Sequence, residues 1–141
     1  MAKRTSEAQW EGTLKDGKGR FWTASGEVSG VYSFATRFED QQGSNPEELI
    51  GAALASCFSM KFAGDLEAEG HRPENVRTVA TVDLQKGDAG WAIQGIDLDT
   101  QAHAGGIDEG ELRRIAEGSK ENCPISKALA VPIRVQASLA G

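Results

Sequence analysis

One long helix is the strongest structural signal in this sequence, and the rest of the fold must be built around it. Asn45 is a suitable N-cap, Pro46 follows at the first helical position, and Glu48 stands three residues after the cap. Apolar side chains then recur at every fourth position, at Ile50, Leu54, Phe58, Phe62 and Leu66. We expect this helix to end near Glu69, before Gly70, and to lie at the centre of the structure.

Shorter patterns on both sides of the helix predict strands, a second helix and turns. The predicted strands are residues 8–13, 20–23, 31–38, 76–86, 91–103 and 133–139. A turn over residues 86–90 joins two of them into a hairpin, and a more polar helix is predicted over residues 108–121. A short turn is predicted over 126–129. The sequence thus predicts an α+β fold in a single domain over residues 1–141.

The charge balance excludes two classes of partner. The chain has 15 Lys and Arg residues against 21 Asp and Glu residues, and the basic residues are scattered. This pattern argues against binding to nucleic acid or to an anionic membrane. No run of about 18 apolar residues stands out, and no apolar segment follows the charged start, so we expect a soluble cytoplasmic protein.

Only two cysteines are present, Cys57 inside the predicted helix and Cys123 immediately before Pro124. In a reducing compartment, such a pair serves catalysis or metal binding, or is inert, more often than it forms a permanent disulfide. Neither cysteine has a second Cys or a His at ligand spacing, so the sequence predicts no metal site. A thiolate can reduce a peroxide and become a sulfenic acid, which a second thiol then resolves. On this interpretation Cys57 attacks and Cys123 resolves, whereas buried cysteines without chemistry are the alternative.

Four sequence segments together resemble a known family. They are residues 36–39 (Thr-Arg-Phe-Glu), 45–53 (Asn-Pro-Glu-Glu-Leu-Ile-Gly-Ala-Ala), 56–60 (Ser-Cys-Phe-Ser-Met) and 122–126 (Asn-Cys-Pro-Ile-Ser). The chain resembles the OsmC/Ohr family of osmotically inducible and organic-hydroperoxide-resistance proteins over nearly its whole length, and is closer to the OsmC branch. The resemblance implies an OsmC-like antiparallel sheet with a central cysteine-bearing helix and a second helix, in an intertwined homodimer.

The resemblance also implies an activity. Relatives of this kind are thiol peroxidases, which reduce organic hydroperoxides, and hydrogen peroxide less well, through a sulfenic acid and an intramolecular disulfide. The implied context is oxidative and osmotic stress defence. No cofactor is implied. The implied reductant is a dithiol, of which a lipoylated protein is one example.

Two charged residues are carried over as members of the site by the resemblance. Arg37 would favour the thiolate and hydrogen-bond the peroxide, and Glu47 would orient Arg37 through a bidentate pair. Glu47 precedes Cys57 by ten helical residues, or about 15 Å along the axis. Either Arg37 spans much of that gap with some bending of the helix, or Arg37 and Glu47 come from the partner subunit.

Apolar side chains around Cys57 are candidates for binding an alkyl tail. They are Leu54, Phe58, Met60 and Phe62. If these four line a pocket, organic hydroperoxides gain binding energy that hydrogen peroxide lacks.

Lys61 and the two histidines leave alternatives open. Lys61 follows Cys57 by four residues, where the family pattern has a small or apolar residue, and it either lowers the thiol pKa or extends to the rim. His71 and His103 are expected at the surface.

Two other function classes compete with the peroxidase. One is a cysteine hydrolase pairing Cys57 with a histidine, and the other is a non-catalytic protein that binds an apolar ligand.

Overall fold

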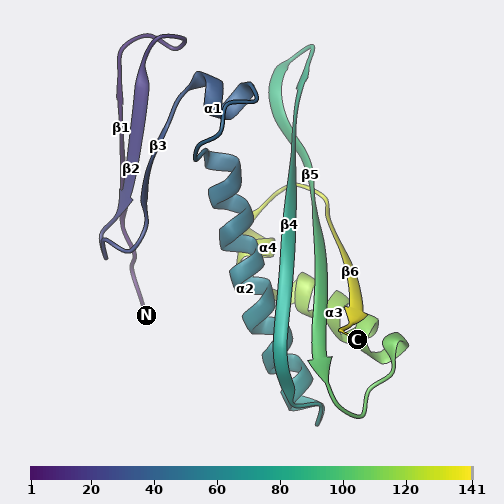
Figure 1. Cartoon of the computed structure of the whole chain (residues 1–141). Coiled ribbons are helices and arrows are strands. Elements are labelled where there is room, and N and C mark those ends of the chain that lie inside the picture. The colour runs from purple at the N-terminus through teal and green to yellow at the C-terminus, as the bar shows by residue number, and fades with distance from the viewer. Residues whose placement is uncertain (141) are drawn as a thin grey trace. The chain divides into compact units, whose positions relative to one another are not determined.

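In the computed structural model, which describes residues 1–140, the chain forms two compact units. The first is Met1–Leu49, and the second begins at Ile50, inside the long helix. Each unit has its own three-stranded sheet (Figure 1). The mixture of helices and strands confirms the α+β prediction, whereas the single domain stays a prediction.

The first unit is an antiparallel meander followed by a short helix. Its elements are β1 (Ser6–Glu11), β2 (Lys18–Thr23), β3 (Ser29–Tyr32) and α1 (Phe34–Phe38). The prediction of a continuous strand over residues 31–38 is wrong in its second half. The Ser33 hydroxyl accepts from the Thr36 backbone N–H at 3.2 Å, and the Thr36 hydroxyl accepts from the Ser33 N–H at 2.8 Å. This reciprocal cap satisfies free backbone donors and starts a helix where side-chain alternation alone predicted a strand.

The long helix α2 (Pro46–Ala68) begins and ends as the sequence predicts. Asn45 Oδ1 accepts from the Glu48 N–H at 2.8 Å, which is the expected N-cap bond. Gly70 has φ of 86°, and the N–H that follows it, from His71, donates to the Leu66 carbonyl at 2.8 Å. By length and composition alone α2 is also a candidate membrane span, a test that the core helix of a soluble protein passes too.

The second unit contains the remaining strands and helices. They are β4 (Pro73–Gly87), β5 (Gly90–Ala104), α3 (Glu109–Asn122), α4 (Pro124–Ala128) and β6 (Ile133–Leu139). The predicted hairpin, second helix and last strand are confirmed, and the turn predicted after Cys123 is the short helix α4. One pairing differs from the expected antiparallel sheet, because β6 runs parallel to β5. The helical connection between these strands allows this, since parallel neighbours need a crossover segment.

A bulge explains the imperfect alternation of β5. Leu84 pairs with Ile93 and Asp83 pairs with Gly95, so Gln94 has no counterpart on β4. One extra residue reverses which side chains face inward along a strand. Both Ile93 and Ile96 can therefore contribute to the core of the second unit.

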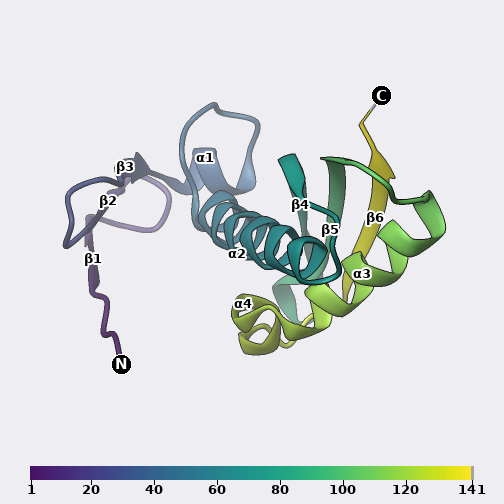
Figure 2. The ribbon, with the colours of Figure 1, turned by 90° about the horizontal axis from the view of Figure 1, so that it is seen from below.

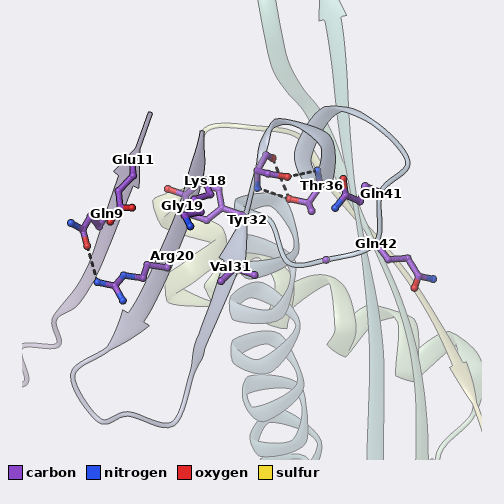
Figure 3. A pocket seen from close by; sticks show the side chains of 12 residues that line it. Gln9, Glu11, Lys18, Gly19, Arg20, Val31, Tyr32, Thr36, Gln41 and Gln42 are labelled. Atoms are coloured by element: carbon purple, nitrogen blue, oxygen red, sulfur yellow. Dashed lines mark hydrogen bonds between the residues drawn. The ribbon is translucent and has the colours of Figure 1, made fainter. Parts of the chain in front are cut away.

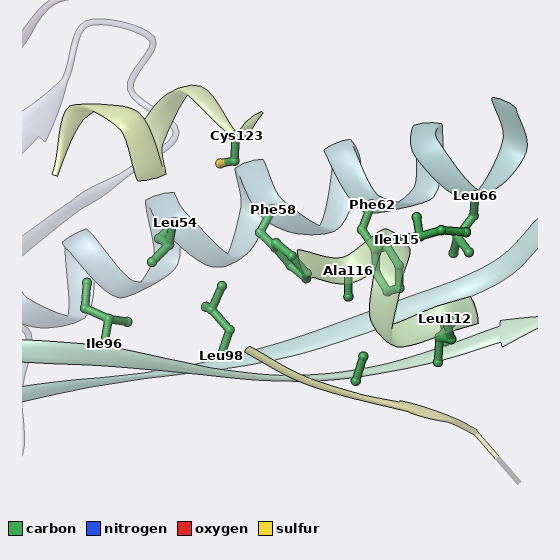
Figure 4. Packing of buried hydrophobic residues seen from close by; sticks show 12 residues of the cluster. Leu54, Phe58, Phe62, Leu66, Ile96, Leu98, Leu112, Ile115, Ala116 and Cys123 are labelled. Carbon is green, nitrogen blue, oxygen red and sulfur yellow. The ribbon is translucent and has the colours of Figure 1, made fainter. Parts of the chain in front are cut away.

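The core of the second unit lies between its sheet and helices α2 and α3, which cover the same face of the sheet (Figure 2). Figure 4 shows the α2 side chains pointing towards Ile96 and Leu98 of β5. The fully buried side chains of α2 are Leu54, Phe58, Phe62 and Leu66. Burial of each such side chain contributes about 1.5–3 kcal/mol, so this face holds α2 firmly against the sheet.

Candidate active site

Two thiols meet inside the second unit. Cys57 lies in the middle of α2, and Cys123 lies at the junction where α3 ends and α4 begins. Their Sγ atoms are 2.8 Å apart although 66 positions separate the residues. Both cysteines are free, and Cys123 is completely buried among core side chains (Figure 4). A disulfide is about 2.05 Å long, so the pair is reduced and close to bonding distance.

Burial and the shared hydrogen bond set the acidity of the two thiols. Burial raises the pKa of Cys57, and its hydrogen bond with Cys123 raises it further. Burial also acts to raise the pKa of Cys123, but its hydrogen bonds with Cys57 and with the Ser126 backbone outweigh burial and bring that pKa below its usual value. The surroundings of Cys57 in one chain therefore disfavour its thiolate.

The predicted pair of charged residues is present in the first unit. Arg37 is in the last turn of α1 and Glu47 is in the first turn of α2. Both Arg37 Nε and Arg37 Nη2 lie 3.0 Å from Glu47 Oε1. The pair therefore uses one carboxylate oxygen, and the expected bidentate geometry is wrong. Glu47 Oε2 is buried and has no hydrogen-bond partner among the described residues, so this carboxylate can accept another donor.

An apolar pocket of about 260 Å³ adjoins Arg37 in the first unit. Its walls are Trp10, Leu14, Tyr32, Ser33, Phe34, Arg37 and Phe38. The guanidinium carbon of Arg37 also lies 4.9 Å from the centre of the Phe38 ring, a cation–π contact. This pocket was not predicted from the sequence, although Phe34 and Phe38 on either side of Arg37 were an available signal.

A second hollow of about 530 Å³ lies beside the strands of the same unit (Figure 3). Its lining mixes cations, an anion and amides, including Lys18, Arg20, Glu11 and Gln9. Arg20 Nη2 already donates to Gln9 Oε1 at 3.0 Å. This mixture of charges does not select one class of ligand.

The predicted alkyl pocket around Cys57 is wrong for three of its four residues. Leu54, Phe58 and Phe62 are completely buried in the core, where no substrate can reach them. The same four-residue spacing that suggested a pocket turns them towards the sheet. Met60, in contrast, is 82% exposed and lies off that buried face.

Lys61 pairs with a carboxylate, and both histidines are at least partly exposed to solvent. Lys61 Nζ pairs with Asp65 Oδ1 at 2.5 Å, one turn further along α2. His103 is exposed and His71 is half-buried. The side chain that is hydrogen-bonded to Cys57 is the thiol of Cys123 rather than a histidine.

Comparison with known proteins assigns the chain to a family. The family model described as OsmC-like protein matches residues 39–138. The chain is 42% identical over 137 residues to Peroxiredoxin OsmC of Escherichia coli (strain K12), covering 96% of each. This chain belongs to the OsmC family.

Solved structures of the OsmC/Ohr type share the fold at lower identity. The organic hydroperoxide resistance protein OhrB of Bacillus subtilis is 22% identical with a TM-score of 0.71, covering 96% of this chain and 98% of that one. An organic hydroperoxide resistance protein OsmC from Legionella pneumophila is also 22% identical, with a TM-score of 0.73 over the full length of both chains. The OsmC-like fold is therefore established for this protein.

Proposed function

We propose that this protein is a cysteine-dependent peroxidase that reduces organic hydroperoxides, and hydrogen peroxide less well, in oxidative and osmotic stress defence. The observation that carries the proposal is the Cys57–Cys123 pair, with Sγ atoms 2.8 Å apart and both thiols free. The 42% identical relative is named a peroxiredoxin, and the structural neighbours include organic hydroperoxide resistance proteins, which supports the same chemistry.

The reaction proceeds in two steps within one chain. The Cys57 thiolate attacks one peroxide oxygen, so that an S–O bond forms and the O–O bond breaks. The departing alkoxide takes up a proton and leaves as the alcohol, and Cys57 becomes a sulfenic acid. The Cys123 thiol then attacks the Cys57 sulfur, water leaves, and a disulfide remains. An external dithiol restores both thiols by exchange.

Arg37 and Glu47 supply the activation that Cys57 lacks. A guanidinium keeps its charge at all working pH values, so it favours the thiolate and can hydrogen-bond the developing oxygen anion. Glu47 holds Arg37 through the contacts at 3.0 Å. Glu47 and Cys57 are ten residues apart on α2, about 15 Å along a straight helix. We therefore assign Arg37 and Glu47 to the site of the partner subunit in a homodimer.

Exposed surface on α2 supports the homodimer. Within residues 51–65 of α2, the exposed residues are all small or apolar, namely Ala52, Ala53, Ser56, Met60 and Gly64. Small side chains permit close approach of a second layer. In the first unit, strand β1 is also almost entirely exposed, so both units have surfaces that a second copy can cover.

The aromatic pocket beside Arg37 is the best candidate for the alkyl group of the substrate. Its volume of about 260 Å³ fits a short chain or the end of a longer one. Each buried CH₂ contributes about 0.8 kcal/mol, so three or four methylenes favour an organic hydroperoxide by on the order of a hundredfold. The pocket thus replaces the core residues of α2 as the proposed substrate-binding surface.

The proposed setting is the cytoplasm, and the proposed reductant is a dithiol such as a lipoylated protein. Cytoplasmic thiol systems keep cysteines reduced, as this pair requires between turnovers. A dithiol is suited to the task because its second thiol releases the mixed disulfide that the first one forms.

The contacts of Cys57 favour the peroxidase over a cysteine hydrolase, since a hydrolase requires a base within hydrogen-bond reach of its nucleophile. The test is peroxide consumption with excess dithiol, comparing the wild-type chain with Cys57→Ser. We expect turnover by the wild type and none by the variant. Wild-type protein that consumes no organic hydroperoxide would contradict the proposal, and rapid acyl-enzyme formation would favour the hydrolase.

A further inference from the structure

A partly buried polar contact joins α2 to α3 in the second unit. The Ser119 hydroxyl donates to Asp65 Oδ2 at 2.7 Å, and Ser119 is completely buried. Lys61 Nζ holds the other oxygen, Asp65 Oδ1, at 2.5 Å. We refer to these three residues as the Lys61–Asp65–Ser119 link.

The link lies next to the sulfur pair along both helices. Cys57, Lys61 and Asp65 follow one another at intervals of four residues, so they share one stripe of α2. Ser119 is one turn before Cys123, and the Cys123 N–H donates to the Ser119 carbonyl at 2.9 Å. The position of the Cys123 backbone is thus coupled to a residue that is itself bonded to α2.

The contact between Asp65 and Ser119 is of the stronger kind. Burial acts to raise the pKa of Asp65, but the hydrogen bonds from Lys61 and Ser119 outweigh it and hold that pKa below its usual value. The carboxylate is therefore charged at neutral pH. The Ser119 hydroxyl also lies 3.0 Å from the Ile115 carbonyl, but the nearer, charged acceptor is favoured.

An exposed ion pair provides a natural comparison. Just beyond α2, Glu69 pairs with Arg114 of α3, and both side chains are largely exposed to solvent. Exposed pairs of this type contribute little to stability. The partly buried contact of Ser119 is therefore expected to control the position of the end of α3 more strongly than the exposed pair.

We propose that Asp65 and Ser119 are positioning residues for disulfide closure, which hold the last turn of α3 so that Cys123 meets the oxidised Cys57. This inference rests on the proposed peroxidase function. The sulfenic acid on Cys57 has two fates, attack by Cys123 with loss of water, or oxidation by a second peroxide to sulfinic acid. Correct placement of Cys123 raises the rate of the first fate only, because the second needs no partner thiol.

The test separates peroxide attack from disulfide closure in rapid mixing with tert-butyl hydroperoxide. Ser119→Ala removes the donor, Asp65→Ala removes the acceptor, and Asp65→Asn keeps an acceptor without the charge. Arg114→Gln, which breaks the exposed pair, is the matched control. We expect Ser119→Ala and Asp65→Ala to close the disulfide about tenfold more slowly, with unchanged attack by Cys57. Arg114→Gln should close it at close to the wild-type rate, and Asp65→Asn, which keeps a weaker neutral acceptor, at a rate between those of the wild type and Asp65→Ala.

Two further readouts distinguish positioning from loss of folding or of function. The slow variants should accumulate more sulfinic acid at equal peroxide excess, measured by mass spectrometry. Their disulfide should also be easier to reduce in a dithiol buffer, by about tenfold in equilibrium constant, a readout that needs no peroxidase activity. If Ser119→Ala does not fold, the comparison of Asp65→Ala with Asp65→Asn decides whether this contact positions Cys123. If Ser119→Ala and Asp65→Ala close the disulfide at the wild-type rate and have the wild-type redox equilibrium, the proposal is overturned. If the wild-type chain does not consume peroxide, that result counts against the proposed function instead.

Discussion

The Sγ atoms of Cys57 and Cys123 lie 2.8 Å apart, one from the middle of a helix and the other from the junction of two helices. Because the sulfurs already lie near bonding distance, disulfide formation requires only a small displacement. In the proposed mechanism Cys57 is the nucleophile and Cys123 is the nearby resolving thiol, and the two roles can be tested separately.

The two thiols should divide the labour. Cys57→Ser should abolish peroxide consumption, because the attacking sulfur is gone. Cys123→Ser should consume about one equivalent and then stall as a sulfenic acid that a dimedone-type reagent traps. Mass spectrometry of the labelled chain provides the measurement. Continued turnover by Cys57→Ser would contradict the roles assigned to the two cysteines.

The pH dependence of oxidation should reveal the contribution of Arg37. Burial and the contact with Cys123 raise the pKa of Cys57, so without an added cation the thiolate fraction is small at neutral pH and grows as pH rises. Arg37→Ala should therefore oxidise about a hundredfold more slowly near neutral pH. Its rate should keep rising above about pH 8.5, whereas the wild-type rate should level off at lower pH.

Second-order oxidation rates measured across that pH range check this prediction. Arg37→Lys is the control, because a lysine keeps the charge but lacks the fork of donors, and it should recover only part of the rate. Superimposable pH profiles for the wild type and Arg37→Ala would remove Arg37 from the mechanism.

Mixing experiments should show whether the site is shared between subunits. Near neutral pH, an Arg37→Ala chain alone should be about a hundredfold slower than the wild type and a Cys57→Ser chain alone inactive, but a mixed dimer would contain one complete site if Arg37 acts across the interface. We expect activity to return after the two are unfolded together and refolded. If the Cys57→Ser chain also carries the Arg37→Ala substitution, mixing should not restore activity. A monomer in sedimentation at micromolar concentration would refute this arrangement.

Core and pocket residues should respond differently to truncation. Leu54→Ala removes a completely buried side chain and should lower the free energy of unfolding by about 2–5 kcal/mol, measured by urea titration. The ratio of its rates for organic and hydrogen peroxide should stay the same. If Leu54→Ala keeps the wild-type stability but changes this ratio of rates, Leu54 belongs to the substrate site after all.

Truncation in the aromatic pocket should, in contrast, change the ratio of the rates for organic and hydrogen peroxide. Phe34→Ala should slow the oxidation of Cys57 by a fatty-acid hydroperoxide by roughly tenfold, while the rate with hydrogen peroxide changes little. The measurement is the second-order rate for hydrogen peroxide, tert-butyl hydroperoxide and the fatty-acid hydroperoxide at one pH. Equal losses for all three would exclude alkyl recognition by this pocket.

Structural features that local sequence patterns determine could be predicted from the sequence. Helix α2 carries its cap at Asn45, its stop at Gly70 and its four-residue apolar period in one continuous segment. The segment after Tyr32 could not be assigned from alternation, because the reciprocal bonds between Ser33 and Thr36 decide its conformation.

The candidate site was proposed from local patterns in the same way. Motif residues suggested Cys57, Cys123, Arg37 and Glu47 as site residues, but the apolar period of α2 does not reveal whether a helix face contacts the substrate or the sheet. Contacts between distant segments, such as Ser119 with Asp65, depend on how α3 packs and leave no local pattern. These features required the three-dimensional structure.

Thiol counting after a single addition of peroxide tests the central claim most directly. Fully reduced protein receives one equivalent of tert-butyl hydroperoxide, and free thiols, tert-butanol and the mass of the chain are measured. We predict rapid loss of both Cys57 and Cys123 thiols, formation of the alcohol in equal amount and an intramolecular disulfide that a dithiol reverses. Retention of both thiols with intact hydroperoxide would contradict the account and leave the binding-protein alternative.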